Sequence, residues 1–355
     1  MLICRCTHKP MNKAAINSLL NAFKRLSLEE REKFLSTISM ECAPSDEKYL
    51  LDIKFVDGAS CPFCNEHTHV VKYGKTDNGK QRYKCKHCDR LFTVTSQSVI
   101  QGTHKTIATW KKYISCMMGK MTIRQCAEEC NISVRTAFLW RHKILHSLQK
   151  MMDEVKLSGI VEADETFFPL SFKGNHKKSR KFAMPRRSHK RGKSIRKRGL
   201  SREQVCVPCA VNRNGLSVSK ITNLGRASTK AIKTLFHGVI ESDSVLCTDS
   251  LAAYATFARN NNIKHVKVAS GLFSNGVYNI QRVNNYHSRL KNFMNRFNGV
   301  STKHLNNYLL WHNFVNFAKE TVSEKTNILF KHMLSENCFM PGYEISAKCA
   351  VPLVA

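Results

Sequence analysis

The sequence is short of acidic residues. It has 26 Asp and Glu against 57 Lys and Arg, which gives a formal net charge of +31 at pH 7. Solubility does not require so large an excess, so we expect a polyanionic partner, and nucleic acid is the commonest one. An acidic membrane surface is the rival partner, but the chain offers no compact basic amphipathic helix with an apolar anchor.

Long apolar runs are also missing. No segment offers the ~20 apolar residues of a membrane-spanning helix, and the first residues lack the apolar core of a secretory signal peptide. We therefore expect a cytoplasmic, nucleoid-associated protein that is neither secreted nor bound to a membrane. A reducing compartment argues against disulfides despite the 15 cysteines. At 355 residues the chain can form two or three domains, each with a core.

Four cysteines are spaced as Cys-x2-Cys-x20-Cys-x2-Cys; these are Cys61, Cys64, Cys85 and Cys88. Two such pairs suit a tetrahedral zinc site with four thiolates, and the segment between them has the pattern of a hairpin, with a turn at Thr76–Gly79. The pattern predicts a zinc ribbon with structural Zn²⁺; disulfide pairing is the alternative. We interpret the other cysteines, including Cys206 and Cys209, as core residues.

A helix-turn-helix is predicted after the zinc ribbon. Residues 121–130 form a short helical pattern, 131–133 a turn that ends in the N-cap Ser133, and 134–143 a second helix. The second helix carries three candidate DNA contacts, Arg135, Arg141 and Lys143. A plain helical hairpin is the alternative.

Residues 161–168 have the pattern of a strand that contains acids. Successive side chains alternate, so Glu162 and Asp164 would share one face, and burying them is costly without a cation or hydrogen bonds. An edge strand with its acids in water is the alternative. A second apolar strand, Val245–Thr248, ends in Asp249. Two distant acids at strand positions in so basic a chain indicate a site for a hard divalent cation on a nucleic-acid enzyme.

The surrounding pattern predicts the fold class. Strands at 204–211 and 216–222 are joined through Asn214-Gly215, and alternating helices and strands follow up to residue 268. Three antiparallel strands followed by strand and helix in alternation predict an RNase H-like α/β domain within an α+β multidomain chain. We expect a helical region at 1–54, a zinc ribbon at 55–102, a helix-turn-helix at 103–152, a catalytic domain at 155–320, and a C-terminal helix and tail at 321–355.

A basic insert interrupts this domain at 173–202, where 14 of 30 residues are Lys or Arg. Such a segment does not pack, and it would contact phosphates and make binding salt-dependent. Its candidate DNA contacts are Arg186, Arg187, Lys190 and Arg191. A solvated loop and a nuclear-localisation signal are the alternatives.

The last predicted helix of the domain, 282–298, is amphipathic. Asn284 and Lys291 lie seven residues apart and share one flank, whereas His287 lies nearer the apolar stripe.

The order of these motifs resembles the ISXO-like group of insertion-sequence transposases, bacterial relatives of the Merlin transposons. The motifs are the zinc ribbon, the helix-turn-helix, Val-Glu-Ala-Asp-Glu-Thr at 161–166, the basic insert, Cys-Thr-Asp-Ser at 247–250, and Val-Asn-Asn-Tyr-His-Ser-Arg-Leu-Lys at 283–291 ahead of Arg-Phe-Asn-Gly-Val-Ser-Thr-Lys-His-Leu at 296–305. The likeness covers roughly residues 55 to 320.

The resemblance implies a DDE-type recombinase. Asp164 and Asp249 would be the first two ligands of Mg²⁺ or Mn²⁺, and the third position, usually Glu, falls on Asn284, with His287 as the competing assignment. Lys291 would match the family lysine and hold phosphate. We add the hypothesis that Glu162 supplies the missing negative charge. The substrates would be double-stranded DNA at the transposon ends and the target, and a homo-oligomer is expected because both ends must be cut and joined.

Two other functions compete with an active transposase. A non-catalytic DNA-binding regulator, domesticated or inactive, would keep the zinc ribbon and helix-turn-helix on a dead core, and Asn284 favours it. A structure-selective nuclease would cut branched DNA without strand transfer. Terminal inverted repeats around the coding region are expected only for a mobile element.

Overall fold

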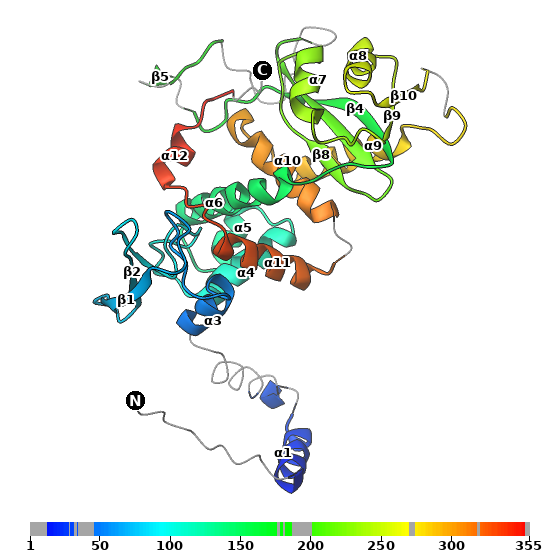
Figure 1. The fold of residues 1–355 in the computed structure, drawn as a ribbon. Helices are drawn as coiled ribbons and strands as arrows, with labels where there is room; N and C mark the ends of the chain where they lie inside the picture. The colour runs from blue at the N-terminus through cyan, green and yellow to red at the C-terminus, as the bar shows by residue number, and fades with distance from the viewer. Residues whose placement is uncertain are drawn as a thin grey trace. The chain divides into compact units, whose positions relative to one another are not determined.

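The computed structural model describes residues 13–27, 29–31, 34, 46–175, 178–179, 182–186, 201–269, 274–317 and 320–351. The chain divides into two compact units, Met1–Asp52 and Ile53–Ala355. The first unit contains α1 (Lys13–Arg25), and α3 (Asp46–Lys54) spans the boundary (Figure 1). After α1, the Ser27 N–H donates to Glu30 Oε2 at 2.9 Å and the Glu30 N–H donates to Ser27 Oγ at 3.3 Å, which together form a capping box.

The second unit begins with a small antiparallel sheet, ordered β1-β2-β3. Its strands are β1 (Val70–Lys75), β2 (Gln81–Cys85) and β3 (Leu91–Thr93). The predicted hairpin is confirmed, and its turn closes through the Gly79 N–H and the Thr76 carbonyl at 2.8 Å. Gly79 has φ +75°, a conformation that glycine adopts without strain.

Helices follow, each begun by a hydroxyl N-cap. They are α4 (Ile107–Met118), α5 (Ile123–Glu129) and α6 (Val134–Asp153), capped by Thr106, Thr122 and Ser133. These caps satisfy backbone N–H groups that the first turn leaves free. Trp110 of α4 stacks on Trp140 of α6, with ring centroids 3.6 Å apart. Two later helices complete this helical region: α11 (Val322–Ser335) packs on α4 and α6, and α12 (Gly342–Ala347) packs on α6.

A five-stranded mixed sheet forms the centre of the following α/β region. Its order is β10-β9-β4-β7-β8, with β7 antiparallel to β4 and β8, and β9 parallel to β4 and β10. The strands are β4 (Ile160–Pro169), β7 (Gln204–Asn212), β8 (Ser217–Ser219), β9 (Val245–Thr248) and β10 (Lys264–Lys267). Within the basic insert, β5 (Lys178–Ser179) and β6 (Phe182–Ala183) pair with each other.

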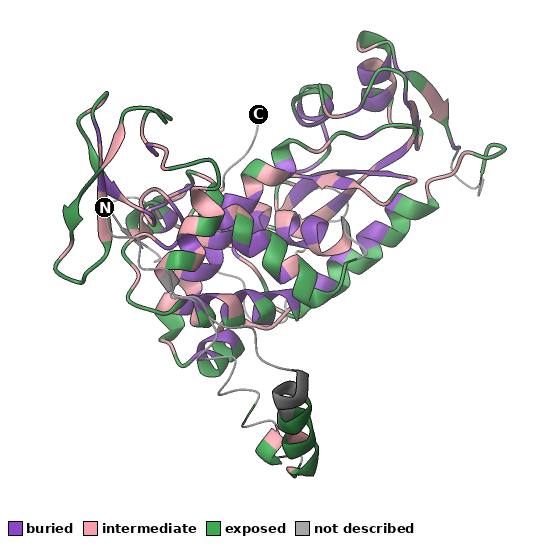
Figure 2. Ribbon diagram, turned by 60° about the horizontal axis from the view of Figure 1, so that its bottom comes forward, coloured by how far each residue is buried: buried purple, intermediate pink, exposed green. Residues whose placement is uncertain are grey.

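Helices cover both faces of the sheet (Figure 1). One face packs on α7 (Thr229–Phe236) and α8 (Ala252–Asn260), where Val161 and Ala163 join the main apolar core. The other face meets α9 (Gln281–Asn295) and α10 (Thr302–Phe317). Figure 2 shows buried residues running through the sheet and these helices.

The sequence analysis named no helix at 302–317. Most residues of α10 are buried, so its sequence lacks the one-sided apolar stripe that marks a surface helix. No helix in the part of the chain that the structure describes is long and apolar enough to cross a membrane.

Candidate active site and zinc site

Two carboxylates belong to two neighbouring strands: Asp164 lies in the middle of β4, and Asp249 directly follows β9. Ala163 of β4 pairs with Thr248 of the parallel strand β9, so Asp164 and Asp249 are the next pair in register. Their side chains therefore share one face, on strands about 4.8 Å apart. Asp164 Oδ1 accepts the Glu165 N–H at 2.8 Å, and Asp249 Oδ1 accepts the Leu251 N–H at 2.9 Å.

The negative charges of Asp164 and Asp249 repel each other. The pKa of Asp164 is raised to about 6, mainly by burial; the Glu165 N–H and the charge of Lys291 lower this pKa, and the charge of Asp249 raises it. Only 22 % of the Asp164 side chain is exposed. Acids placed together in this way are stabilised by a cation between them. The pair therefore fits a divalent metal ion.

Glu165 lies on the opposite face of β4, as the alternation predicted. Burial, together with the charge of Asp164, raises the pKa of Glu165 to about 7. Burial, together with the charge of Glu165, raises the pKa of Tyr254 on α8. Glu165 thus lies on the face of the sheet that packs on α8, whereas Asp164 lies on the face that meets α9.

Glu162 anchors helix α9 to the sheet. Its Oε2 accepts the backbone N–H groups of Arg282 at 2.7 Å and Val283 at 3.2 Å, and its Oε1 lies 3.6 Å from Arg213. The side chain is fully buried. The Glu162 carboxylate therefore compensates the positive end of the α9 dipole and the guanidinium of Arg213. Because its charge is already compensated there, the hypothesis that Glu162 supplies charge to a metal ion is wrong.

The three candidate residues of helix α9 differ in how they lie relative to the carboxylates. His287 is 8 % exposed, and its Nδ1 lies 3.8 Å from Asp164 Oδ2. Burial and the charge of Lys291 lower the pKa of His287 to about 4, so the imidazole is neutral at pH 7. Asn284, one turn earlier, and Lys291, one turn later, are both exposed. The structure therefore brings His287 against Asp164 and leaves Asn284 on the open flank of the helix.

A buried polar network fixes α9 from its other side. Tyr286 Oη donates to Asn313 Oδ1 of α10 at 2.5 Å and lies 2.7 Å from Ser219 Oγ of β8. This network went unpredicted, because it joins three elements that are distant in sequence.

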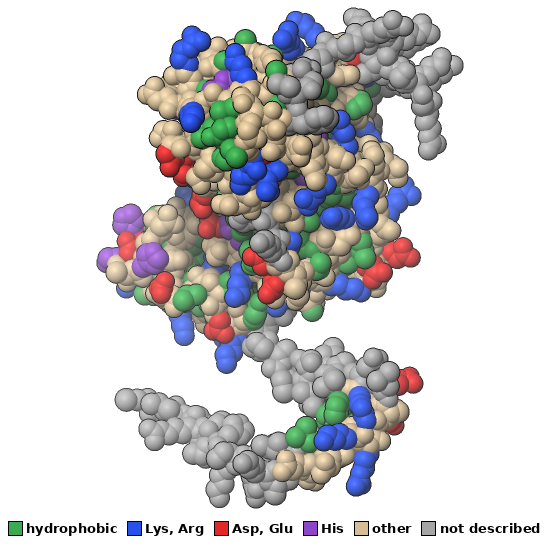
Figure 3. Space-filling model, turned by 90° about the vertical axis from the view of Figure 1, so that its right-hand side faces the viewer, with side chains coloured by type: hydrophobic (Ala, Val, Ile, Leu, Met, Phe, Trp, Pro, Cys, Tyr) green, Lys and Arg blue, Asp and Glu red, His purple; other side chains and the backbone are tan. Residues whose placement is uncertain are grey.

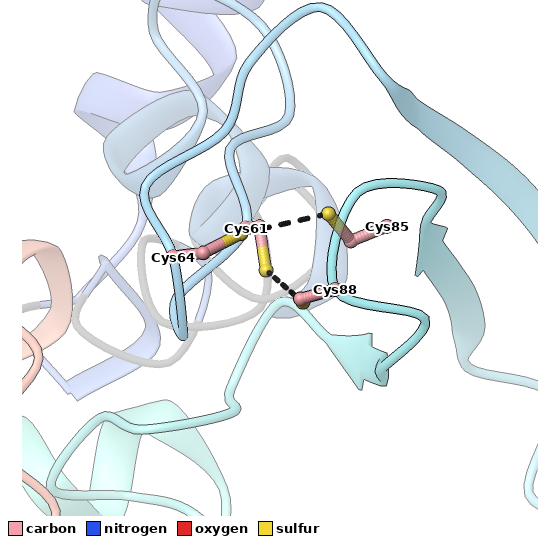
Figure 4. A group of neighbouring side chains, drawn as sticks. All are labelled: Cys61, Cys64, Cys85 and Cys88. Carbon is pink, nitrogen blue, oxygen red and sulfur yellow. Dashed lines mark hydrogen bonds between the residues drawn. The ribbon is translucent and has the colours of Figure 1, made fainter.

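The four predicted zinc ligands converge (Figure 4). They are the only group of three or more His, Cys, Asp or Glu residues in the described ranges whose ligand atoms all lie within 4.8 Å of one another. The Sγ atoms of Cys61 and Cys88 are 3.6 Å apart, and those of Cys64 and Cys85 are 3.7 Å apart. Tetrahedral zinc with Zn–S bonds of ~2.3 Å requires a separation of about 3.8 Å. These two separations are close to that value, so the cluster could bind zinc.

The candidate DNA contacts on α6 have different surroundings. Arg135 is exposed at the start of the helix. Arg141 is 0 % exposed and donates to the Met121 carbonyl at 2.7 Å and to Cys126 Sγ at 3.2 Å. The prediction that Arg141 contacts DNA is therefore wrong, because its guanidinium links α6 to the preceding helices. Lys143 is half-buried, with its Nζ 5.5 Å from the ring centre of Phe339.

In the basic insert, Arg186 is the one candidate among the described residues. Its Nε lies 2.9 Å from Glu203 Oε2, and its guanidinium stacks 5.6 Å from the ring centre of Phe172. The other three candidates, Arg187, Lys190 and Arg191, lie outside the described residues.

Residues 156–314 match the family model of the ISXO2-like transposase domain. The chain carries an ISXO2-like transposase domain. This transposase domain begins just before β4 and ends within α10, so it includes Asp164, Asp249 and all of α9. The cysteine cluster and α4 to α6 precede it.

Two known proteins are similar to the chain. The "Uncharacterized protein in transposable element ISH50" of Halobacterium salinarum is 25% identical over 263 residues, which are 73% of this chain and 86% of that protein. The solved structure titled "Crystal structure of a pre-cleavage Mos1 transpososome" covers 64% of this chain and 78% of its own, with 8% identity and a TM-score of 0.21.

Proposed function

We propose that the chain is an insertion-sequence transposase that binds terminal inverted repeats and catalyses metal-dependent DNA cleavage and strand transfer. The pairing of Asp164 and Asp249 on adjacent strands of the transposase domain carries the proposal. The strand order, with only β7 reversed, supports an RNase H-like fold.

The proposed site uses the chain's residues in separate roles. Asp164, Asp249 and Asn284 would hold Mg²⁺ or Mn²⁺, the amide oxygen of Asn284 being a neutral ligand. When bound, such ions supply Lewis acidity for in-line attack on a phosphodiester, first by water and then by the freed 3′-hydroxyl. His287 would hold the Asp164 carboxylate in place, and Lys291 would bind a phosphate oxygen. Positioning and charge stabilisation dominate this reaction.

DNA recognition is proposed for the parts of the chain outside the catalytic face. The zinc-binding sheet and α5–α6 would read the terminal repeats, with Arg135 at the exposed start of α6. Lys and Arg side chains are scattered over the face that Figure 3 shows, and the basic insert adds more to the sequence. Because both transposon ends must be cut and joined together, we propose a homo-oligomer on the DNA.

Strand joining tests the proposal. Purified protein would be incubated with Mg²⁺, a target plasmid and a duplex that carries the inverted repeat flanking the coding region. We expect Asp164→Ala and Asp249→Ala each to reduce joining by ~10³-fold or more, because each loses metal binding. Asp243→Ala is the matched control, since Asp243 is exposed just before β9 begins.

A non-catalytic DNA-binding regulator is the second candidate function. The exposed, uncharged Asn284 favours it, because an amide weakens a metal site relative to a carboxylate. A regulator would bind the repeats with equal affinity in the wild type and in Asp164→Ala, and it would join no strands in either.

A further inference from the structure

A cavity of about 780 Å³ is lined by none of the residues assigned above to metal binding, but one of its lining residues, Lys291, interacts electrostatically with Asp164. It is bounded by the end of β4, the segment that follows β4, the second half of α9 and the start of α10. Phe168 lines it and occupies the same face of β4 as Asp164, four residues further on, which corresponds to about 13 Å. Lys291 also lines it, and the charge of Lys291 reaches Asp164. The cavity therefore adjoins the place where a phosphodiester would be cut.

The walls of the cavity are largely apolar and aromatic. Phe168 is half-buried, while Phe172 and Met294 are each 8 % exposed, and all three line the space. A cavity of this size admits a single nucleotide but no base-paired duplex. Flat aromatic walls bind nucleobases by stacking, whatever the base, because every base has a π-face.

Two cations hold the wall in place. Lys173 Nζ donates to the carbonyls of Gly299 at 2.9 Å and Asn298 at 3.1 Å, just after α9. Arg186 is paired with Glu203 at 2.9 Å and stacks on Phe172. Lys291 is exposed and lines the cavity, and its charge lowers the pKa of Asp164.

We propose that this cavity receives one unstacked nucleobase of the DNA strand undergoing cleavage, which stacks on Phe168 while Lys291 binds an adjacent phosphate. The inference rests on the proposed function, because it assigns part of the same substrate. Enzymes that act within a duplex often extrude a nucleotide into a fitted pocket at a cost of a few kcal/mol, which stacking in the pocket offsets.

The test compares two probes on the full-length protein, a short oligothymidylate and the same backbone with abasic sites. In magnesium-free buffer at fixed salt, we expect the wild type to bind the base-bearing strand about tenfold more tightly. Phe168→Leu keeps an apolar side chain but removes the π-face, so the preference should disappear. Phe168→Trp should retain it, which a pure packing role would not predict. Tyr343→Ala removes an aromatic side chain that is 73% exposed on α12 and should change nothing.

Equal binding of the two probes by the wild type, or an unchanged preference in Phe168→Leu, would overturn the proposal. Failure here is distinguishable from failure of the proposed function. A protein that joins strands with Mg²⁺ but shows no base preference lacks only the base-binding cavity. A protein that shows a Phe168-dependent preference but joins no strands has the cavity without the transposase activity.

Discussion

At the scale of single residues, Asp164 is unfavourable to the folded protein when no metal is bound. Its pKa is raised from 3.8 to about 6, mainly by burial and further by Asp249. The folded state therefore binds a proton more tightly than the unfolded state. The resulting destabilisation is absent below pH 3.8, grows between pH 3.8 and 6, and is complete above pH 6.

We predict that Asp164→Asn stabilises the metal-free protein above pH 6 by up to about 3 kcal/mol. The gain should become small near pH 4 and vanish below about pH 3, because wild-type Asp164 is then protonated in both states. Thermal unfolding in magnesium-free buffer without a chelator, which would also remove zinc, measures the difference. A gain that is the same at pH 4 and pH 8 would show that charge is not its cause.

The two arginines of α6, Arg135 and Arg141, should differ in role: Arg141 should contribute to stability and Arg135 to DNA binding. Arg141→Ala leaves buried acceptors without a donor and should lower the free energy of unfolding by several kcal/mol. Arg135→Ala should leave stability unchanged, weaken DNA binding and reduce the slope of log affinity against log salt by about one. Thermal unfolding and fluorescence anisotropy at several salt concentrations separate these effects. Unchanged DNA affinity in Arg135→Ala would contradict a role for this end of α6.

Helix α9 is the element on which the arrangement of the site depends, and Glu162 is its anchor. We predict that Glu162→Ala lowers the free energy of unfolding by about 1–3 kcal/mol, because two backbone N–H groups lose their acceptor and Arg213 loses its ion-pair partner. Strand joining should slow, while the Mg²⁺ concentration for half-maximal activity should stay the same, since Glu162 is not a ligand. A higher Mg²⁺ concentration for half-maximal activity in Glu162→Ala would show that Glu162 does contribute to metal binding.

The Mg²⁺ concentration for half-maximal strand joining also identifies the third metal ligand. Asn284→Ala should raise the Mg²⁺ concentration for half-maximal joining, and Asn284→Asp should lower it, because a carboxylate binds the ion more strongly. His287→Gln should slow joining without changing that concentration. If His287→Gln, rather than Asn284→Ala, raises the requirement, the imidazole is the ligand.

The small N-terminal sheet depends on its cysteine cluster. Cys85→Ser should reduce the zinc bound per chain and unfold β1 to β3, because so small a sheet has little core of its own. Cys349→Ser, at an exposed cysteine, is the matched control. Zinc content by atomic absorption gives the result, and full zinc occupancy in Cys85→Ser would exclude Cys85 as a ligand.

Elements with local signals could be predicted from the sequence, and those shaped by distant partners could not. The alternation in β4, the Asn-Gly turn after β7 and the cysteine spacing are local, and the structure confirms each. Helix α10 is buried on most sides, so no periodic stripe marks it. The anchoring role of Glu162 depends on residues 120 positions away, and Arg141 resembles a surface cation because no local pattern records its burial.

At the scale of the whole molecule, the second unit joins segments that are far apart in sequence. Helix α10 of the transposase domain packs on α6, where Asn307 lies 3.0 Å from His142, and α11 completes the helical region of α4 and α6. The predicted boundary at residue 320 therefore falls between helices that both pack on α6. The net charge of +31, by contrast, is a property of composition alone, and it predicts a nucleic-acid partner without any structure.

The most direct test of the central claim, that Asp164 and Asp249 share a divalent metal ion, is a change of metal preference in strand joining. Asp249→Cys replaces a hard oxygen ligand with a softer thiolate, which Mn²⁺ accepts better than Mg²⁺ does. We predict that this variant loses joining with Mg²⁺ and regains a measurable part of it with Mn²⁺, while Asp243→Cys joins equally with both ions. Full activity of Asp249→Cys with Mg²⁺ would contradict the account.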